Sequence, residues 1–570
     1  MMSHYADEGI EPSDCGAESD EFTPLLGGKD ASIEVVGVTL KSSCGKGDEE
    51  SALGGSLLGD KQSPADVSSG IAGIISILLL GVFIASLDGS LVLATSGTIS
   101  SEFNDLGNAG WLVSSYTLAM CATQSLYGKL SDIYGRKGTI LVSYGFFTVG
   151  CAICGLGQSL PSVVFGRLIA GIGGAGINCL VAISKQPVHA LIHKDMVPIR
   201  EVAKWRSYVN IAATTGRSLG GPIGGFLADT IGWRWSFLIQ CPPTLLALIL
   251  VSQKLHIVIN DPPCKQSHLS KLRRIDFLGS ITLCICIVCS LLVLDLGGTR
   301  MSWTEPLLLT LLGVAVAGGV CFILVEAYWA KEPVFPLRLL RNRDVLTSYV
   351  GLGCQSGAQM AITDHASVTA AGAHLMPSVM GNALGGLLTG HIIHRTGHYH
   401  PLLLLSALSS LTAYTLLLLR WHGHTTFLES LYIIPGGFGN GIALSAFFVS
   451  LTSGVETEEM AIASSGLYLS SNVGMLVGLS VADCIMRRGL DTGLRVALEG
   501  WHGGGGMDMG RREIIRRAGS DVEFVRGLEG ELGMVVRRVW VGSLGKTHVV
   551  SIVGALMALV AACCMREHRL

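Results

Sequence analysis

Long apolar runs alternate with short polar segments along most of the chain. With a window of about 19 residues, fourteen runs are long enough to cross a bilayer, which takes about 20 residues each. Because backbone polar groups must bond internally in hydrocarbon, the pattern predicts an all-α membrane protein in contact with the lipid bilayer. The predicted spans are 71–94, 108–127, 138–157, 161–183, 208–228, 233–251, 276–296, 306–329, 345–362, 370–393, 401–420, 427–452, 460–484 and 548–564.

Composition agrees with the apolar pattern and excludes several function classes. Only 15% of residues are charged and the mean hydropathy is +0.51, whereas soluble proteins carry roughly a quarter charged residues. A net charge of -3 gives no general attraction to nucleic acid, so no nucleic-acid partner is expected. Most of the 16 cysteines lie inside apolar runs, and the closest group, Cys284, Cys286 and Cys289, contains no His or acid. We therefore expect no metal site, no cofactor and no enzyme activity.

Basic residues in the short loops predict the orientation of the chain. Eighteen Lys and Arg residues fall in short loops on the side of the N-terminus, against three on the opposite side. By the positive-inside rule, both termini are expected in the cytosol.

The spans group into two halves around an insertion. The predicted units are a disordered cytoplasmic tail (1–69), an N-terminal six-span half (70–251), a linker with two additional spans (252–344) and a C-terminal six-span half (345–570). Within the last unit, 485–547 reads as a long non-cytoplasmic loop with one or two amphipathic helices on the membrane face. Span 345–362 reads as shortened, because Asp364 and His365 interrupt the apolar run.

The loop between spans two and three concentrates charge in a chain that has little. GKLSDIYGRK, Gly128 to Lys137, holds one acid and three bases. A weaker echo, GGLLTGHIIHRTGHY from Gly385 to Tyr399, joins spans ten and eleven. The two loops hold equivalent places if the halves are internal repeats.

These residues resemble the major facilitator transporters, whose loop signature Gly-x-Leu-x-Asp-x-x-Gly-Arg-Lys is matched by GKLSDIYGRK. GRLIAGIGGAG (166–176) is similar to the family's Arg-x-x-x-Gly motif, GRSLGGPIGG (216–225) to its antiporter motif, and ASLDGSLVLAT (85–95) to a motif of the fourteen-span drug:proton antiporter branch. The resemblance covers 70–570 and is nearest to fungal vacuolar basic amino acid transporters. It implies a major facilitator fold of two six-helix halves plus two additional spans, with a small-molecule substrate and protons as partners.

The resemblance implies that the loop holds the two halves together on the cytoplasmic side. We call its five signature residues the latch motif: Gly128, Asp132, Gly135, Arg136 and Lys137. The glycine at 128 lets helices approach closely, and the aspartate is expected to pair with the arginine and to face the positive N-terminal end of span thirteen, near Met460. The simpler alternative is that the bases only fix topology.

Three ionisable residues inside spans are candidates for transport and proton coupling: Asp88, Arg167 and Arg217. A carboxylate in a low dielectric can take up a proton near neutral pH. Arg217 stands where the antiporter motif usually has glycine, and its guanidinium suits a substrate carboxylate, with Asp88 for the amine. A structural pair of Asp88 with Arg217 is the alternative. Helix packing is expected at Gly221, Pro222, Gly224 and Gly225.

The tail carries Glu21, Leu25 and Leu26 in the spacing of an acidic dileucine signal, which sorting adaptors read on the way to vacuoles. The expected function is therefore a proton-coupled antiporter that moves amino acids, basic ones first, across the vacuolar membrane by alternating access. A multidrug or toxin exporter at the plasma membrane, or a non-transporting nutrient receptor of the same fold, remains as the alternative.

Overall fold

The computed structural model describes residues 64–570 except for several short gaps, and within that part the regular elements are helices. The gaps are 104, 106–107, 184–198, 255–275, 298–300, 331–332, 364–369, 422–426, 457–458, 500–509, 511–513, 516, 519–524, 526 and 569–570. The helices are α1 (Pro64–Glu102), α2 (Trp111–Tyr134), α3 (Arg136–Leu156), α4 (Leu160–Ile183), α6 (Ile199–Thr230), α7 (Trp233–Leu238), α8 (Cys241–Lys254), α10 (Phe277–Leu296), α11 (Pro306–Tyr328), α12 (Leu337–Arg341), α13 (Arg343–Thr363), α14 (Ala370–Thr396), α15 (His400–Arg420), α16 (Phe427–Ser430), η2 (Leu431–Ile433), α17 (Ile434–Ser453), α18 (Met460–Ala497) and α21 (Gly530–Cys564).

Each of the predicted spans coincides with a helix or with consecutive helices. In the described residues, 10 helical stretches are long and apolar enough to cross a membrane by length and composition. The remaining spans lie on α2, α6, α13 and α14, which are more polar. Three of these helices, α2, α6 and α14, take part in the contacts between the two halves, together with α4, α17 and α18.

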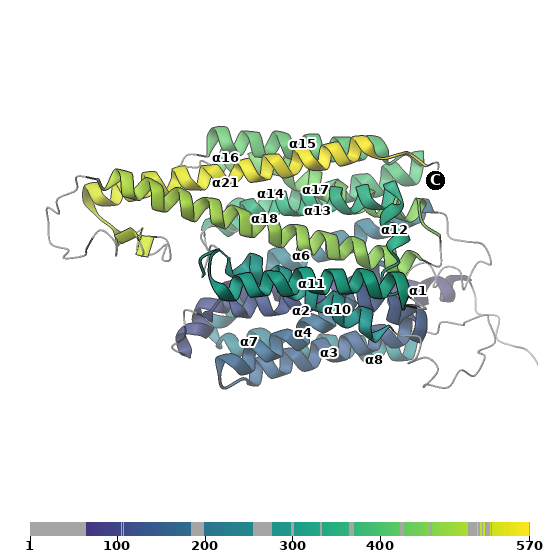
Figure 1. Ribbon diagram of the computed structural model, residues 1–570. Helices are drawn as coiled ribbons and strands as arrows, with labels where there is room; N and C mark the ends of the chain where they lie inside the picture. Colours follow the sequence, from purple (N-terminus) through teal and green to yellow (C-terminus); the bar gives the residue numbers. More distant parts are fainter. Residues whose placement is uncertain are drawn as a thin grey trace, which may run out of the picture. The chain divides into compact units, whose positions relative to one another are not determined.

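Glycines allow the helices of the N-terminal half to pack closely. On α4, a side chain at Gly171 or Gly174 would collide with Tyr116 of α2, and one at Gly173 with the backbone of Phe147 on α3. Small residues permit such backbone approach in membrane helices. The glycine-rich run of span four therefore places α4 between α2 and α3, as Figure 1 shows.

In the C-terminal half, α13 and α18 pack closely because each helix has glycines at the contact. Gly353 and Gly357 lie against Gly474 and Gly478, and any Cβ on the latter pair would come within 2.3 Å of a backbone oxygen of the former. Among the other helices of this half, α14 and α15 pack on α17, and α21 packs on α13 and α15.

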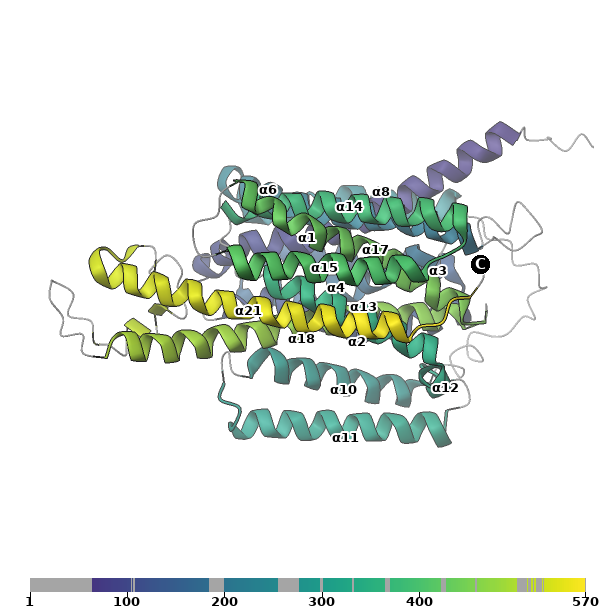
Figure 2. The same cartoon turned by 90° about the horizontal axis from the view of Figure 1, so that it is seen from above.

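The additional spans form a helical pair at the side of the bundle. α10 packs against both α2 and α18, and α11 packs mainly on α10, an arrangement that Figure 2 shows from above. Asp276 caps α10 by accepting the Gly279 N–H at 2.8 Å, and Pro306 starts α11. Asp295 near the other end of α10 accepts a hydrogen bond from Ser114 of α2 at 2.9 Å.

Two boundaries differ from the predictions at the ends of spans. α1 begins at Pro64, so the last residues of the expected tail are helical, in keeping with the preference for proline in a first turn. α13 has 21 residues, about 32 Å of helix, which is enough to cross the hydrocarbon without the expected shortening. Its polar break at 364–369 lies outside the described residues.

The predicted long loop 485–547 is a further difference, because helix continues into it from both sides. α18 has 38 residues and α21 has 35, about 57 Å and 52 Å of helix, far more than a membrane crossing needs. Figure 1 shows the two running side by side past the other helices. The extension has its own apolar core, which is what allows helix to persist outside the bundle: Leu490, Leu494, Leu498, Ile514, Ala518, Val525, Leu528 and Val536.

Candidate functional site

A fully buried ion pair joins α1 to α4 in the N-terminal half. Nη1 of Arg167 lies 2.5 Å from Oδ2 of Asp88, and the two side chains are 1% and 0% exposed. Arg167 also donates through Nε to the Leu112 carbonyl of α2 at 3.0 Å. Buried charges are retained only when paired and hydrogen-bonded, and inside a membrane such pairs usually serve function.

A break in span six supplies the second partner of the carboxylate. The predicted span 233–251 is two helices, α7 and α8, and Gln240 lies in the turn between them. Its amide nitrogen donates to Oδ1 of Asp88 at 3.2 Å and to the Ser236 carbonyl at 2.9 Å. Pro242 and Pro243 follow in the first turn of α8, where proline is tolerated.

An aromatic ring covers the guanidinium. The Tyr116 ring centroid lies 4.3 Å from the Arg167 guanidinium carbon, within the range of a cation–π contact. Sequence reasoning missed Tyr116 and Gln240 as parts of this site. The isolated polar residue before the paired prolines of IQCPP was the available signal for Gln240.

Arg217 is not part of this cluster, so the alternative of a structural pair between Asp88 and Arg217 is wrong. The carboxylate pairs with Arg167 instead, and Arg217 is exposed on α6 and makes no ion pair within the described part of the chain. The two sites are on neighbouring helices, since α1 and α6 pack along their lengths.

One face of α6 carries polar residues that contact the other half, and Arg217 lies on the same face. Ser207, Asn210 and Thr214, spaced as one helix face, contact α14 of the other half, and we call these three the contact stripe. Ser207 donates to the Gly386 carbonyl at 2.5 Å, and Asn210 and Thr214 donate to the Asn382 side-chain oxygen at 2.8 and 3.0 Å.

The same face continues with Arg217, Gly221 and Gly225, beyond the three residues of the contact stripe. A Cβ added at Gly221 or Gly225 would meet nothing within 4 Å. The halves therefore touch beside the contact stripe and leave open space beside the next turns of α6, with Arg217 at the boundary.

A different face of α6 packs on α1, and this corrects part of the packing prediction. Gly216, Gly220 and Gly224 lie against α1, and a Cβ at Gly220 would stand 2.4 Å from the Leu87 carbonyl oxygen. Of the expected packing residues only Gly224 has this role, because Gly221 and Gly225 face open space. Pro222 lies inside α6 and is exposed.

The latch motif lies where α2 meets the start of α18. A Cβ on Gly128 would come within 2.5 Å of the Ser465 hydroxyl and 3.0 Å of the Ala461 carbonyl oxygen. Cys179 of α4 also contacts Ala461, so three helices meet here. We call this the motif end of the bundle, and the opposite end, where α18 extends, the far end.

The remaining latch residues shape the turn. Gly135 has a φ of 82°, which favours glycine, and Gly397 in the echoed loop has a φ of 73°. Lys137 donates to the Ser252 carbonyl of α8 at 2.8 Å. Asp132 is exposed to solvent on one side, and its partial burial raises its pKa to about 6, while the charges of Arg136 and Lys129 act in the opposite direction.

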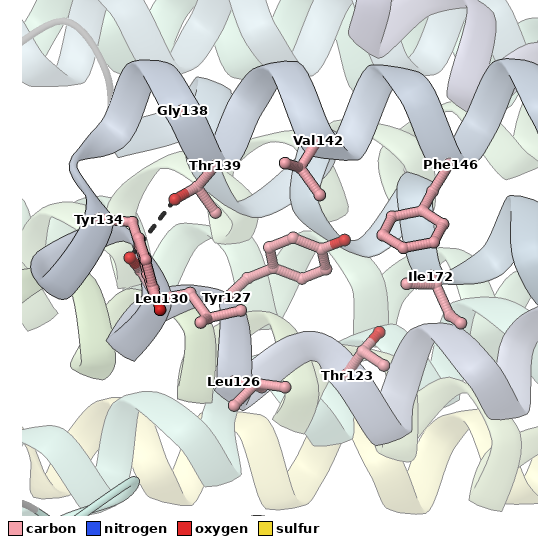
Figure 3. Close-up of a pocket in the computed structure, with 10 residues that line it drawn as sticks. All are labelled: Thr123, Leu126, Tyr127, Leu130, Tyr134, Gly138, Thr139, Val142, Phe146 and Ile172. Carbon is pink, nitrogen blue, oxygen red and sulfur yellow. Dashed lines mark hydrogen bonds between the residues drawn. The ribbon is translucent and has the colours of Figure 1, made fainter. Parts of the chain in front are cut away.

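The cavity in Figure 3 lies within one half and away from the buried pair. It is a half-open pocket of about 430 Å³ between α2, α3 and Ile172 of α4, and its wall is almost entirely apolar. It is lined by Thr123, Leu126, Tyr127, Leu130, Tyr134, Gly138, Thr139, Val142, Phe146 and Ile172. The cavity therefore contains none of the charged candidates for transport.

The sorting residues Glu21, Leu25 and Leu26 lie outside the described residues, as does the rest of the chain before Pro64.

Known proteins are similar to this chain in sequence and in fold. The chain is 31% identical over 485 residues to the vacuolar membrane amino acid uptake transporter fnx2 of Schizosaccharomyces pombe, covering 83% of this chain and 80% of that protein. It is 30% identical to vacuolar basic amino acid transporter 1 of Saccharomyces cerevisiae (71% and 76% covered) and 29% identical to multidrug resistance protein fnx1 of Schizosaccharomyces pombe (86% and 90% covered).

The crystal structure of a double Trp XylE mutant aligns with a TM-score of 0.50 and 14% identity, over 88% of this chain and 97% of that one. The family model described as Major Facilitator Superfamily matches residues 78–479. These residues include the latch motif, the buried Asp88–Arg167 pair and the α6 stripe. The chain therefore belongs to the major facilitator superfamily and is a multi-pass membrane transporter, not an enzyme.

Proposed function

We propose that the protein is a proton-coupled antiporter that moves amino acids, basic ones in particular, from the cytosol into the vacuole. The observation that carries this proposal is the buried Asp88–Arg167 pair beside α6. A proton on Asp88 weakens the pair, because a neutral carboxyl no longer attracts the guanidinium.

Protonation of Asp88 affects the substrate site through the contact between α1 and α6. Leu87, next to Asp88 in the chain, packs on Gly220, one turn from Arg217. Because glycine leaves no side chain to absorb a shift, a movement of α1 on protonation is passed directly to α6. Arg217 then binds the substrate carboxylate in the open space beside Gly221 and Gly225.

Alternating access follows from where the halves touch. Gly128 and the contact stripe hold them together at the motif end, while the α6 face opens beyond Thr214. This arrangement supports a state that is closed toward the cytosol, if the motif end is cytosolic as the loop charges predict.

Arg217→Gln is expected to lower amino acid uptake by at least about ten-fold, mostly through a higher KM, because a charged hydrogen-bonding partner of the carboxylate is lost. Arg217→Lys keeps the charge but not the planar fork and should recover uptake only in part. Initial rates in vacuolar vesicles give the values. Unchanged KM in the glutamine variant would remove Arg217 from the substrate site.

The rival function is drug export at the plasma membrane, which the similarity to fnx1 favours. The decisive experiment expresses the chain in a yeast strain that lacks its own vacuolar amino acid importers. Uptake of lysine, arginine and histidine by isolated vacuoles supports the proposal. Resistance of whole cells to toxic compounds, without vacuolar uptake, supports the rival.

Leu25→Ala combined with Leu26→Ala is expected to move a fluorescent fusion from the vacuolar membrane to the cell surface, because an adaptor reads the paired leucines after Glu21. A matched variant, Leu57→Ala with Leu58→Ala, changes another leucine pair of the same tail. The dileucine has no sorting role if both variants remain at the vacuole.

A further inference from the structure

We propose that Arg206 is an inter-half lock: its side chain, carried by the N-terminal half, holds the motif end closed by inserting between two aromatic rings of the C-terminal half. The inference rests on the proposed alternating-access transport but concerns a residue to which neither the transport motifs nor the buried pair assigns a role.

In the described part of the chain, the hydrogen bonds and ring contacts of the Arg206 guanidinium all cross between the halves. The residue lies in the second turn of α6, and its side chain is 3% exposed. Nη1 bonds the Tyr468 hydroxyl of α18, and Nη2 donates to the Leu444 carbonyl of α17 at 3.3 Å. Its carbon lies 4.5 Å from the Phe448 ring centroid and 5.1 Å from that of Tyr468.

The contacts of Arg206 are weak enough to break in every transport cycle. In the described part of the chain, Arg206 has no carboxylate partner and its buried Nε has no hydrogen-bond acceptor. A cation held by rings and neutral oxygens is stabilised less than one in a buried ion pair. When the halves separate, water satisfies the guanidinium, so release regains hydration that closure had removed.

The lock lies beside the other contacts of the motif end. The next residue, Ser207, begins the contact stripe on α14, and Tyr468 lies two turns into α18, whose first turns cover Gly128. The Cys179 thiol, fully buried against Ala461, lies within the electrostatic influence of both Arg206 and the latch residue Asp132. Loss of Arg206 therefore acts on the same interface that the latch motif closes.

Cys179 is a native reporter of this interface. It is covered when the halves touch and becomes accessible when they part, whereas Cys154 is buried among α3, α4 and the Trp233–Phe237 cluster inside the N-terminal half. The ratio of N-ethylmaleimide labelling at Cys179 to labelling at Cys154, quantified by peptide mass spectrometry, separates opening from unfolding.

We expect Arg206→Met to raise this labelling ratio by about ten-fold in the full-length protein in vesicles, with Tyr468→Phe giving a smaller rise, because the ring remains and only the hydroxyl is lost. Arg341→Met, an exposed arginine at the same end, is the matched control and should leave the ratio unchanged. An unchanged labelling ratio in Arg206→Met, with Cys154 still protected, would overturn the lock. If Cys154 is labelled as well, Arg206→Met has unfolded the half and Tyr468→Phe becomes the test. An unchanged ratio in Tyr468→Phe would then overturn the lock. Because the assay needs no substrate, its result does not depend on whether the protein transports amino acids.

Discussion

Asp88→Asn is expected to lower proton-driven amino acid uptake by at least about 100-fold, the equivalent of about 2.7 kcal/mol, because the side chain can no longer bind and release a proton. It also leaves the Arg167 guanidinium buried without its counter-charge, which by itself costs about 3–5 kcal/mol of stability. Uptake must therefore be measured per unit of protein in the vacuolar membrane. Asp229→Asn, an exposed carboxylate on α6, is the control that should retain uptake.

A double variant separates coupling from folding. Asp88→Asn with Arg167→Gln removes both buried charges, so it avoids the uncompensated buried guanidinium of the single variant. We expect the double variant to regain thermal stability but not proton-driven uptake. Recovery of both would mean that the pair only holds α1 and α4 together.

Gly128→Leu is expected to reduce uptake by at least about 30-fold while the protein remains in its membrane. The new side chain would occupy the place of the Ser465 hydroxyl and the Ala461 carbonyl, so the closed motif end is destabilised by about 2 kcal/mol or more. The carrier should then stay open at the motif end, and labelling of Cys179 should rise.

Gly145→Leu provides the comparison, because a Cβ there meets nothing within 4 Å. Its uptake should stay close to the wild-type value. Equal loss in both variants would show that added bulk, not the inter-half contact, is responsible.

The sequence predicted the helices better than the contacts between them. Hydropathy finds a span because each helix must bury its own backbone, whichever neighbours it has. It does not say which buried charges meet, so it left Arg217 open as an alternative partner of Asp88, whereas the fold places Arg167 beside the carboxylate. The sequence does identify Asp88 and Arg167 as candidates, since ionisable residues at membrane depth are rare.

The other differences have the same origin. Glycines 216, 220 and 224 share the α1 face of α6, but only an observed neighbour distinguishes them from Gly221 and Gly225 on the open face. The pattern of 485–547 predicted amphipathic helix, but not that it continues α18 and α21, because charged outer surfaces end the hydropathy signal and the supporting apolar core is formed between two segments distant in sequence. A single-span window does not register such a core.

The most direct test of the account is the movement of protons when substrate is added. Vacuolar vesicles that contain the protein are acidified by their proton pump, the pump is then inhibited, and lysine or arginine is added while a dye reports lumenal pH. The account predicts that the amino acid enters and the lumen becomes more alkaline, saturably with substrate, and that Asp88→Asn abolishes both responses. Amino acid entry at the same rate with no change in lumenal pH, or a proton response that survives in Asp88→Asn, would contradict it.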